Sequence, residues 1–217
     1  MKNRLTKLSI FLSLIIGMLF ASCGSGTPEM HTVEGVQRVV DVYTKYIDTD
    51  KYKPISIRYT EKGKLTNELG YMTFTMIGKA DNKNHNQTIN IEGGKEVVED
   101  IVAPDASDIY SRFSHLNPNK KEKNFDTEPW IQASEIKPEL IAKLMETSFT
   151  QIEEGYTIES VAYCNISRED KTGEIIYTFG LNVVKDGSTQ YRGKHIVTEY
   201  TTVNFRGHTD GKVEKLN

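Results

Sequence analysis

The chain has 217 residues, and its 27 lysines and arginines against 30 aspartates and glutamates give a formal net charge of −3. This balance excludes the strongly basic footprint that is typical of nucleic-acid-binding proteins. Its two cysteines, Cys23 and Cys164, are too few for a disulfide framework, and their spacing does not fit a zinc site.

The first 22 residues differ in character from the rest of the chain. Three basic residues open this segment, and an almost unbroken apolar run follows over 8–20. A bilayer-spanning helix needs about 20 apolar residues, so the run is too short for one and is typical of the h-region of a secretory signal. Two small residues follow, and then Cys23.

This order of charge, apolar run, small residues and cysteine resembles the lipobox of bacterial lipoproteins. The box is loosened, as is common in Bacteroidetes, because Phe20 stands where the strict pattern has leucine. The resemblance covers about the first 25 residues. It implies a signal peptide over 1–22 and a mature N-terminus at Cys23, which carries diacylglycerol and an N-acyl chain. An ordinary secretory signal cut near Ala21 is the alternative.

Lipidation would make the membrane a partner of the chain and place the protein in the cell envelope, at the outer membrane. Several acyl chains hold a protein on a membrane durably, where one chain does not. Cleavage after residue 22 would remove three basic residues and no acidic ones, leaving a net charge of −6. The mature chain then has enough residues for one domain or two small ones.

A tether over 23–30 leads into a first predicted unit, 31–94. Thr27 as N-cap and Pro28 in the first position predict the start of a helix, and apolar residues then recur at helical spacing over 32–47. Alternating apolar and polar residues predict strands over three ranges: 54–60, 71–77 and 88–92.

Residues 95–133 have mixed character and are interpreted as a connector. A turn of helix is expected within 105–113, and the polar, charged stretch 117–124 is typical of a loop. Trp130, the only tryptophan, follows that loop. We expect it either to contact a partner or to pack at the junction between the halves.

The second predicted unit is 134–217. A helix is expected over 138–153, with Ser134 or Lys137 as N-cap, Pro138 in the first turn and Gly155 as C-cap. Strands are predicted over 157–166 and 175–184, and then over 190–205, as one strand or as two with a bulge. Residues 207–217 are interpreted as a polar tail.

The two halves share the same order, a helix followed by strands. We therefore predict an α+β fold of two similar units, each a helix with an antiparallel sheet, with the helices packed on one face. In element order alone this resembles the duplicated PepSY-like and β-lactamase-inhibitor-like domains. A single cystatin-like or NTF2-like domain with a long insertion is the rival fold.

No catalytic constellation stands out in the sequence. The nucleophile-elbow, phosphate-loop and zinc-helix patterns are absent. Adjacent carboxylates at 99–100, 153–154 and 169–170 point in different directions, so they do not make the facing pair of a glycosidase. Residues 48–50 are interpreted as an exit loop rather than a calcium loop. The histidines stand singly, without metal-ligand spacing: His31, His85, His115, His195 and His208.

These patterns predict no catalytic residue, no metal and no cofactor. Cys164 is interpreted as a small buried hydrophobe in a strand, and the strand aromatics as packing residues. The sequence favours a lipid-anchored, non-enzymatic binding or interaction module with a protein or glycan partner and no nucleic acid. A hydrolase acting on envelope polymers, with distant carboxylates converging in the fold, and a structural subunit of an envelope complex remain as alternatives.

Overall fold

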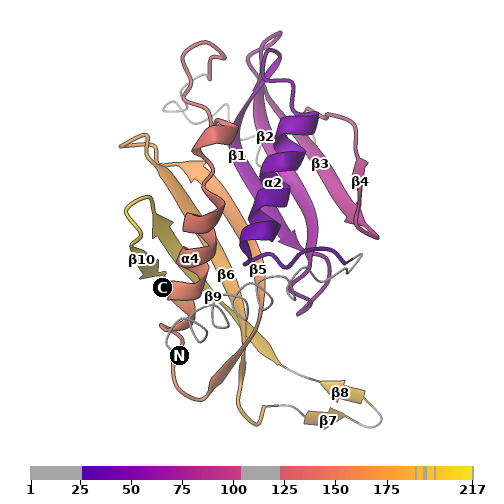
Figure 1. Cartoon of the computed structure of the whole chain (residues 1–217), viewed down its shortest axis with the longest axis vertical. Coiled ribbons are helices and arrows are strands. Elements are labelled where there is room, and N and C mark those ends of the chain that lie inside the picture. The colour runs from indigo at the N-terminus through magenta and orange to yellow at the C-terminus, as the bar shows by residue number, and fades with distance from the viewer. Residues whose placement is uncertain (1–25, 104–122, 189, 193–194, 198, 217) are drawn as a thin grey trace, which may run out of the picture.

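The computed structural model describes residues 26–103, 123–188, 190–192, 195–197 and 199–216. These residues form an α+β structure with one large antiparallel sheet and a separate two-stranded sheet. Figure 1 shows two α-helices crossing in front of the large sheet. Among the described residues, no helix has the length and apolar character needed to span a bilayer.

The large sheet takes its eight strands from both halves of the chain, in the order β10-β9-β6-β5-β1-β2-β3-β4. Every neighbouring pair is antiparallel, and β1 and β5 join the halves with Arg58 opposite Asn165. The strands are β1 (Tyr52–Glu61), β2 (Leu69–Gly78), β3 (Asn84–Glu92), β4 (Lys95–Val98), β5 (Tyr156–Arg168), β6 (Ile175–Lys185), β9 (Tyr200–His208) and β10 (Val213–Lys215).

Helix α2 (Val33–Tyr46) begins later than the sequence predicts. Its N-cap is Thr32, whose Oγ accepts a hydrogen bond from the backbone N–H of Gly35 at 3.0 Å, and not Thr27. A threonine in extended conformation satisfies one of the N–H groups that a helix start leaves unpaired. The prediction of a helix start at Thr27 and Pro28 was therefore wrong.

Helix α4 (Pro138–Phe149) follows a short 3-10 turn, η1 (Ala133–Glu135). Its N-cap is Lys137, and Pro138 occupies the first turn as predicted, because proline there loses no intrahelical hydrogen bond. The helix ends at Thr150, five residues before Gly155. Gly155 instead adopts a φ of 87° just ahead of β5.

Side chains from both helices and from the large sheet share one hydrophobic core. The rings of Tyr43 in α2 and Phe74 in β2 lie 5.7 Å apart between centroids. Leu144 of α4 lies so close to Gly207 of β9 that a Cβ added to this glycine would be 2.8 Å from the leucine Cδ1. The two helices also contact each other.

The strands differ from prediction mainly at the edges of the sheet. Strand β4 occupies the first residues of the predicted connector, where it pairs with β3. The range 190–205 is divided among β7 (Gln190–Arg192), β8 (His195–Val197) and β9, and the predicted polar tail contains β10. Pairing with a neighbouring strand stabilises these short segments, which lack a clear alternation of their own. The predicted helical turn over 105–113 lies outside the described residues.

Candidate functional site

The large sheet has a polar face, formed by the strand residues that alternate with the core residues. Strand pairing arranges them in three rows that each cross six strands. From β3 to β9 the rows are Asn90–Tyr71–Thr60–Tyr163–Gly180–Asn204, Thr88–Thr73–Arg58–Asn165–Thr178–Arg206 and Asn86–Thr75–Ser56–Ser167–Ile176–His208. Only Gly180 and Ile176 in these rows lack a polar group, so the rows are polar almost throughout.

Arg58 and Tyr163 lie at the centre of the polar face. The guanidinium carbon of Arg58 is 4.2 Å from the centroid of the Tyr163 ring, a cation–π distance. The Tyr163 hydroxyl donates a hydrogen bond to Asn204 Oδ1 at 2.8 Å. Burial raises the pKa of Tyr163 although Arg58 opposes the shift, so the phenol stays protonated and able to donate.

A second set of hydrogen bonds fixes the polar side chains next to this centre. Asn182 of β6 donates to Ser160 Oγ at 3.0 Å and to Glu61 Oε1 at 2.8 Å, and it accepts from Thr202 Oγ at 2.8 Å. Ser56 Oγ donates to Asn165 Oδ1 at 2.8 Å. These hydrogen bonds hold the side chains in fixed positions, and fixed polar groups would lose little entropy in a binding event.

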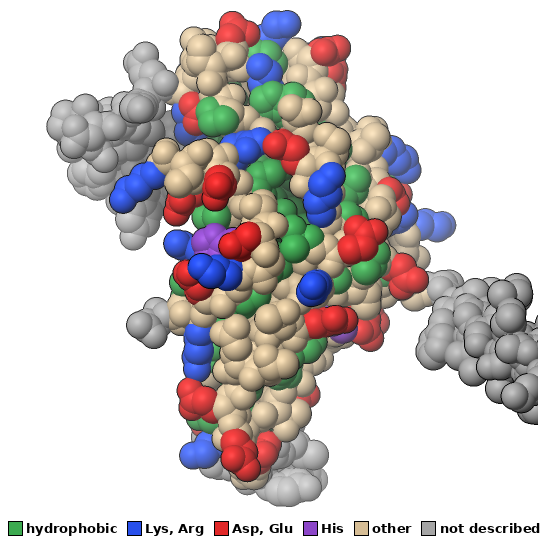
Figure 2. All heavy atoms as spheres, turned by 60° about the vertical axis from the view of Figure 1, so that its left-hand side comes forward, with side chains coloured by type: hydrophobic (Ala, Val, Ile, Leu, Met, Phe, Trp, Pro, Cys, Tyr) green, Lys and Arg blue, Asp and Glu red, His purple; other side chains and the backbone are tan. Residues whose placement is uncertain are grey.

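The charge of the rows differs from that of the chain. The rows contain Arg58, Arg206 and His208 but no carboxylate, although the chain as a whole is acidic. Carboxylates lie beside the rows and not in them: Glu61 accepts from Asn182 at 2.8 Å, Glu99 accepts from Asn90 at 2.7 Å, and Glu214 lies 3.8 Å from His208. In contrast, the side of the molecule seen in Figure 2 intermixes acidic and basic side chains.

A separate depression of about 300 Å³ lies where β1 begins and β2 ends. His85 Nε2 is 3.1 Å from Asp81 Oδ1, and the His85 ring meets that of Tyr52 edge to face. The hydrogen bond with His85 and a backbone N–H from Lys83 lower the pKa of Asp81. Neither a serine nor a cysteine is among the described residues that line this depression.

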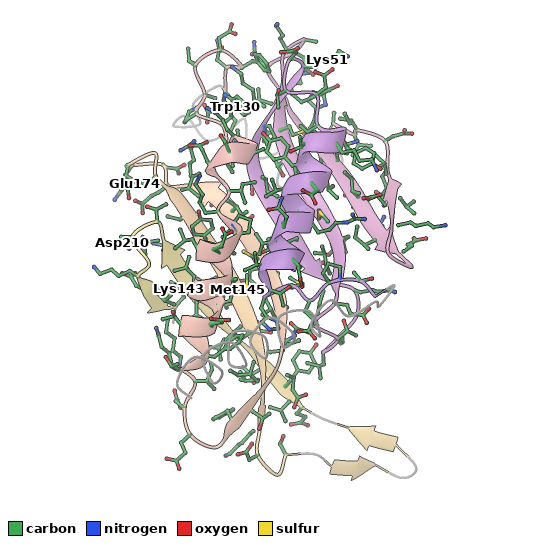
Figure 3. The ribbon with its side chains drawn as sticks, viewed as in Figure 1. Lys51, Trp130, Lys143, Met145, Glu174 and Asp210 are labelled. Atoms are coloured by element: carbon green, nitrogen blue, oxygen red, sulfur yellow. The ribbon has the colours of Figure 1, made fainter. Side chains whose placement is uncertain are left out.

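Trp130 lies at the same end of the molecule as Lys51 (Figure 3). Its ring is partly buried and packs against the core. Its carbonyl accepts hydrogen bonds from Arg168 Nε and Nη2 at 3.1 and 2.8 Å, and Arg168 pairs with Glu135 at 2.7 Å. The role of partner contact stays a prediction, as does lipidation of Cys23, which lies outside the described residues.

Cys164 is fully buried in β5, as the sequence predicts. Burial raises the pKa of its thiol to about 12, although a hydrogen bond with Tyr59 and the charge of Arg58 oppose the shift. The predicted exit loop at 48–50 is a turn in which Asp48 pairs with Lys51 at 2.9 Å. Within the described residues, no three His, Cys, Asp or Glu side chains are grouped so as to hold a metal ion.

The polar face could not be predicted from the sequence, because its rows depend on pairing between distant strands. The alternation pattern identifies outward residues but not their neighbours on adjacent strands, and Tyr163 contacts residues more than 40 positions away in the chain.

Comparison with known proteins gives no match for this chain among family models, curated proteins or solved structures.

Proposed function

We propose that the chain is a lipid-anchored, non-enzymatic binding module of the cell envelope, attached to the outer membrane through Cys23 and binding its partner on the polar face. The observation that carries this proposal is the set of three polar rows centred on Arg58 and Tyr163. A surface of fixed hydrogen-bonding groups on rigid strands suits recognition.

We infer a duplicated architecture behind this face. The strand order is symmetric about the β1–β5 pair, because each half adds its later strands outward from that centre. On this inference, α2 and α4 are equivalent helices that pack on the face opposite the polar rows. Two units joined edge to edge give a face twice as wide as either unit alone, which suits an extended ligand.

The chemistry of the rows favours a glycan over a protein. Hydroxyl and amide side chains both donate and accept hydrogen bonds, so they match the hydroxyl groups of a sugar chain. The core of a protein–protein interface is usually apolar and rich in aromatic residues, whereas the rows contain one aliphatic residue, Ile176. Tyr71, which is 40% exposed, offers a ring against which a sugar can stack.

Photo-crosslinking in intact cells tests this proposal. Benzoyl-phenylalanine replaces Tyr71 on the polar face. The matched control replaces Tyr156, which is 38% exposed and lies outside the three rows, where it borders a depression with Ile152 and Val203. The proposal predicts a protease-resistant, carbohydrate-positive adduct at position 71 and none at 156. Adducts at neither position, or equally at both, would contradict it, and a protease-sensitive adduct at 71 would exclude the glycan.

One observation favours the alternative of a structural subunit. Val97, Val98 and Val102 along the β4 edge are all more than a third exposed. An apolar edge strand is a template for pairing with another chain. If this alternative is correct, Val97→Lys converts an oligomer into a monomer in sedimentation experiments, and if the chain is monomeric before the change, the alternative loses its support.

A further inference from the structure

The two arginines of the polar rows, Arg58 and Arg206, differ from the other arginines whose side chains are described. Those two, Arg38 and Arg168, each pair with a glutamate at 2.7 Å. In contrast, no described carboxylate lies within 4.0 Å of the guanidinium of Arg58 or Arg206, and neither side chain donates a hydrogen bond to a described residue. The donors of these two arginines are therefore left for an anion from outside the chain.

Arg58 is exposed and is held in position by the ring of Tyr163. A guanidinium that stacks on an aromatic ring uses its flat face, so the N–H donors along its edge stay available for a carboxylate or a sulfate. Thr73 and Asn165 are the cross-strand neighbours of Arg58 and place a hydroxyl and an amide beside it. This combination can bind a charged group and a neutral hydroxyl side by side.

Arg206 lies in the same row as Arg58, at a distance that a small anion does not span. Three steps between neighbouring strands separate β1 from β9, which amounts to about 14 Å between the two backbones. Arg206 Nε is buried and has no hydrogen-bond partner among the described residues. Glu214 is opposite Arg206 on β10, but its carboxylate is 3.8 Å from His208. A ligand that reaches both arginines is therefore extended.

The carboxylate of Glu61 does not neutralise this row. Its Oε2 accepts from the backbone N–H groups of Thr66 and Asn67 at 3.0 and 3.3 Å, and its Oε1 accepts from Asn182 at 2.8 Å. Three donors occupy most of the four acceptor positions of a carboxylate. Glu61 repels a negative group next to Asn182, which leaves the row through Arg58 as the path for a charged ligand.

We infer that the ligand of the polar face is an acidic glycan, a sugar chain that carries carboxylate or sulfate groups. It lies along the row Thr88–Thr73–Arg58–Asn165–Thr178–Arg206, with negative groups at the two arginines and neutral hydroxyls at the residues between them. The inference rests on the proposed binding of a glycan to this face, and it adds the charge and the direction of that glycan.

Calorimetric titration of the full-length chain in neutral detergent tests the inference. The probes are polygalacturonate and its methyl ester, which share a backbone and differ in charge. We expect polygalacturonate to bind about tenfold more tightly, and Arg58→Gln to remove this preference, because a charge-assisted hydrogen bond contributes about a factor of ten. Arg58→Lys keeps the charge without the planar fork, so its affinity should lie between those of the wild type and Arg58→Gln.

Lys143→Gln is the matched control. Lys143 is an exposed residue of α4 outside the rows (Figure 3), and the change removes the same single charge. We expect the affinity of this variant for polygalacturonate to equal that of the wild type. Equal losses in Arg58→Gln and Lys143→Gln would mean that only the overall charge matters, which would overturn the inference.

Dextran sulfate beside neutral dextran is the second pair of probes. The pair with the larger ratio of affinities identifies the charged group as carboxylate or sulfate. Equal binding of charged and neutral polymers in both pairs would overturn the acidic ligand and leave the glycan face standing, and no binding of any of the four polymers would also overturn it. Failure of the glycan proposal itself is a separate result, given by the crosslinked adduct at Tyr71.

Discussion

The ring of Tyr163 lies directly across Gly180, and a Cβ added to that glycine would be 2.6 Å from the tyrosine Cε1. Real atoms do not approach so closely, so the ring can occupy this position only because residue 180 has no side chain. This contact places Tyr163 under Arg58 and next to Asn204, at the centre of the polar face.

Gly180→Ala should therefore displace the Tyr163 ring. Overpacking of this kind costs about 1–3 kcal/mol, and the tyrosine hydrogen bond to Asn204 should be lost. Urea unfolding of Gly180→Ala, Tyr163→Ala and the double variant measures the effect. We expect the double variant to be less destabilised than the sum of the single changes. Gly26→Ala, with nothing within 4 Å of the added Cβ, is the neutral control, and additive losses would contradict the contact.

Tyr43→Phe should destabilise the fold without creating a cavity. The Tyr43 hydroxyl donates to the carbonyl of Ile131 at 2.7 Å and joins α2 to the segment that precedes α4. Leaving a buried carbonyl without its donor costs about 1–3 kcal/mol. Thermal unfolding measures the loss. Tyr46→Phe is the control variant, because Tyr46 also lies in α2 but is only partly buried. Equal stability of the two variants would count against this hydrogen bond.

Arg168→Gln should reduce stability at neutral pH by about 1–3 kcal/mol, since it removes a charged hydrogen-bond donor from Glu135 and from the Trp130 carbonyl. Urea unfolding at pH 7 measures the loss. Lys171→Gln, at an exposed position in the following turn, is the matched control and should be nearly neutral.

The same pair predicts a pH dependence. Burial opposes ionisation of Glu135, but the backbone N–H of Gln132, Arg168 and Lys137 together lower its pKa below 4.5. A group with a lowered folded pKa stabilises the fold above its unfolded pKa, and this contribution disappears as the pH falls through the folded value. The gap between wild type and Arg168→Gln should therefore narrow below pH 4.5, and a gap that stays constant down to pH 3 would contradict the pairing.

Cys164 should be unreactive in the folded protein. Its thiol is fully buried and its pKa is raised to about 12 by that burial. The thiolate is the reacting form, so a Cys23→Ser variant at pH 8 should react with a thiol reagent only after unfolding by urea. Reaction of the native protein at the rate of a small thiol would mean that β5 is not buried in solution.

Several features of the fold could be predicted from sequence alone, because they depend on local patterns. Alternating residues identified β1, β2 and β3, and helical spacing together with Pro138 placed α4. The start of α2 was missed because Pro28 and Met30 pair with the β1–β2 connection, a tertiary contact that no local pattern reveals. Strand β4 was missed because its stability comes from pairing with β3.

The candidate site was much less predictable than the fold. Thr73, Arg58 and Asn165 become neighbours only when β2, β1 and β5 pair in one register, and residues far apart in sequence set that register. The close approach of Tyr163 to Gly180 depends on it as well. The sequence pattern therefore indicates which strand residues face away from the core, but only the strand order shows which of them are neighbours on the polar face.

The central claim of an envelope-anchored module is tested most directly by measuring the intact mass of the protein extracted from membranes. The wild type is compared with Cys23→Ala. We expect the wild-type mass to correspond to residues 23–217 plus diacylglycerol and an acyl chain, and the variant to lose both lipid groups and its membrane association. A soluble wild-type chain without lipid mass would contradict the anchor and leave the polar face as the binding surface of an unanchored protein.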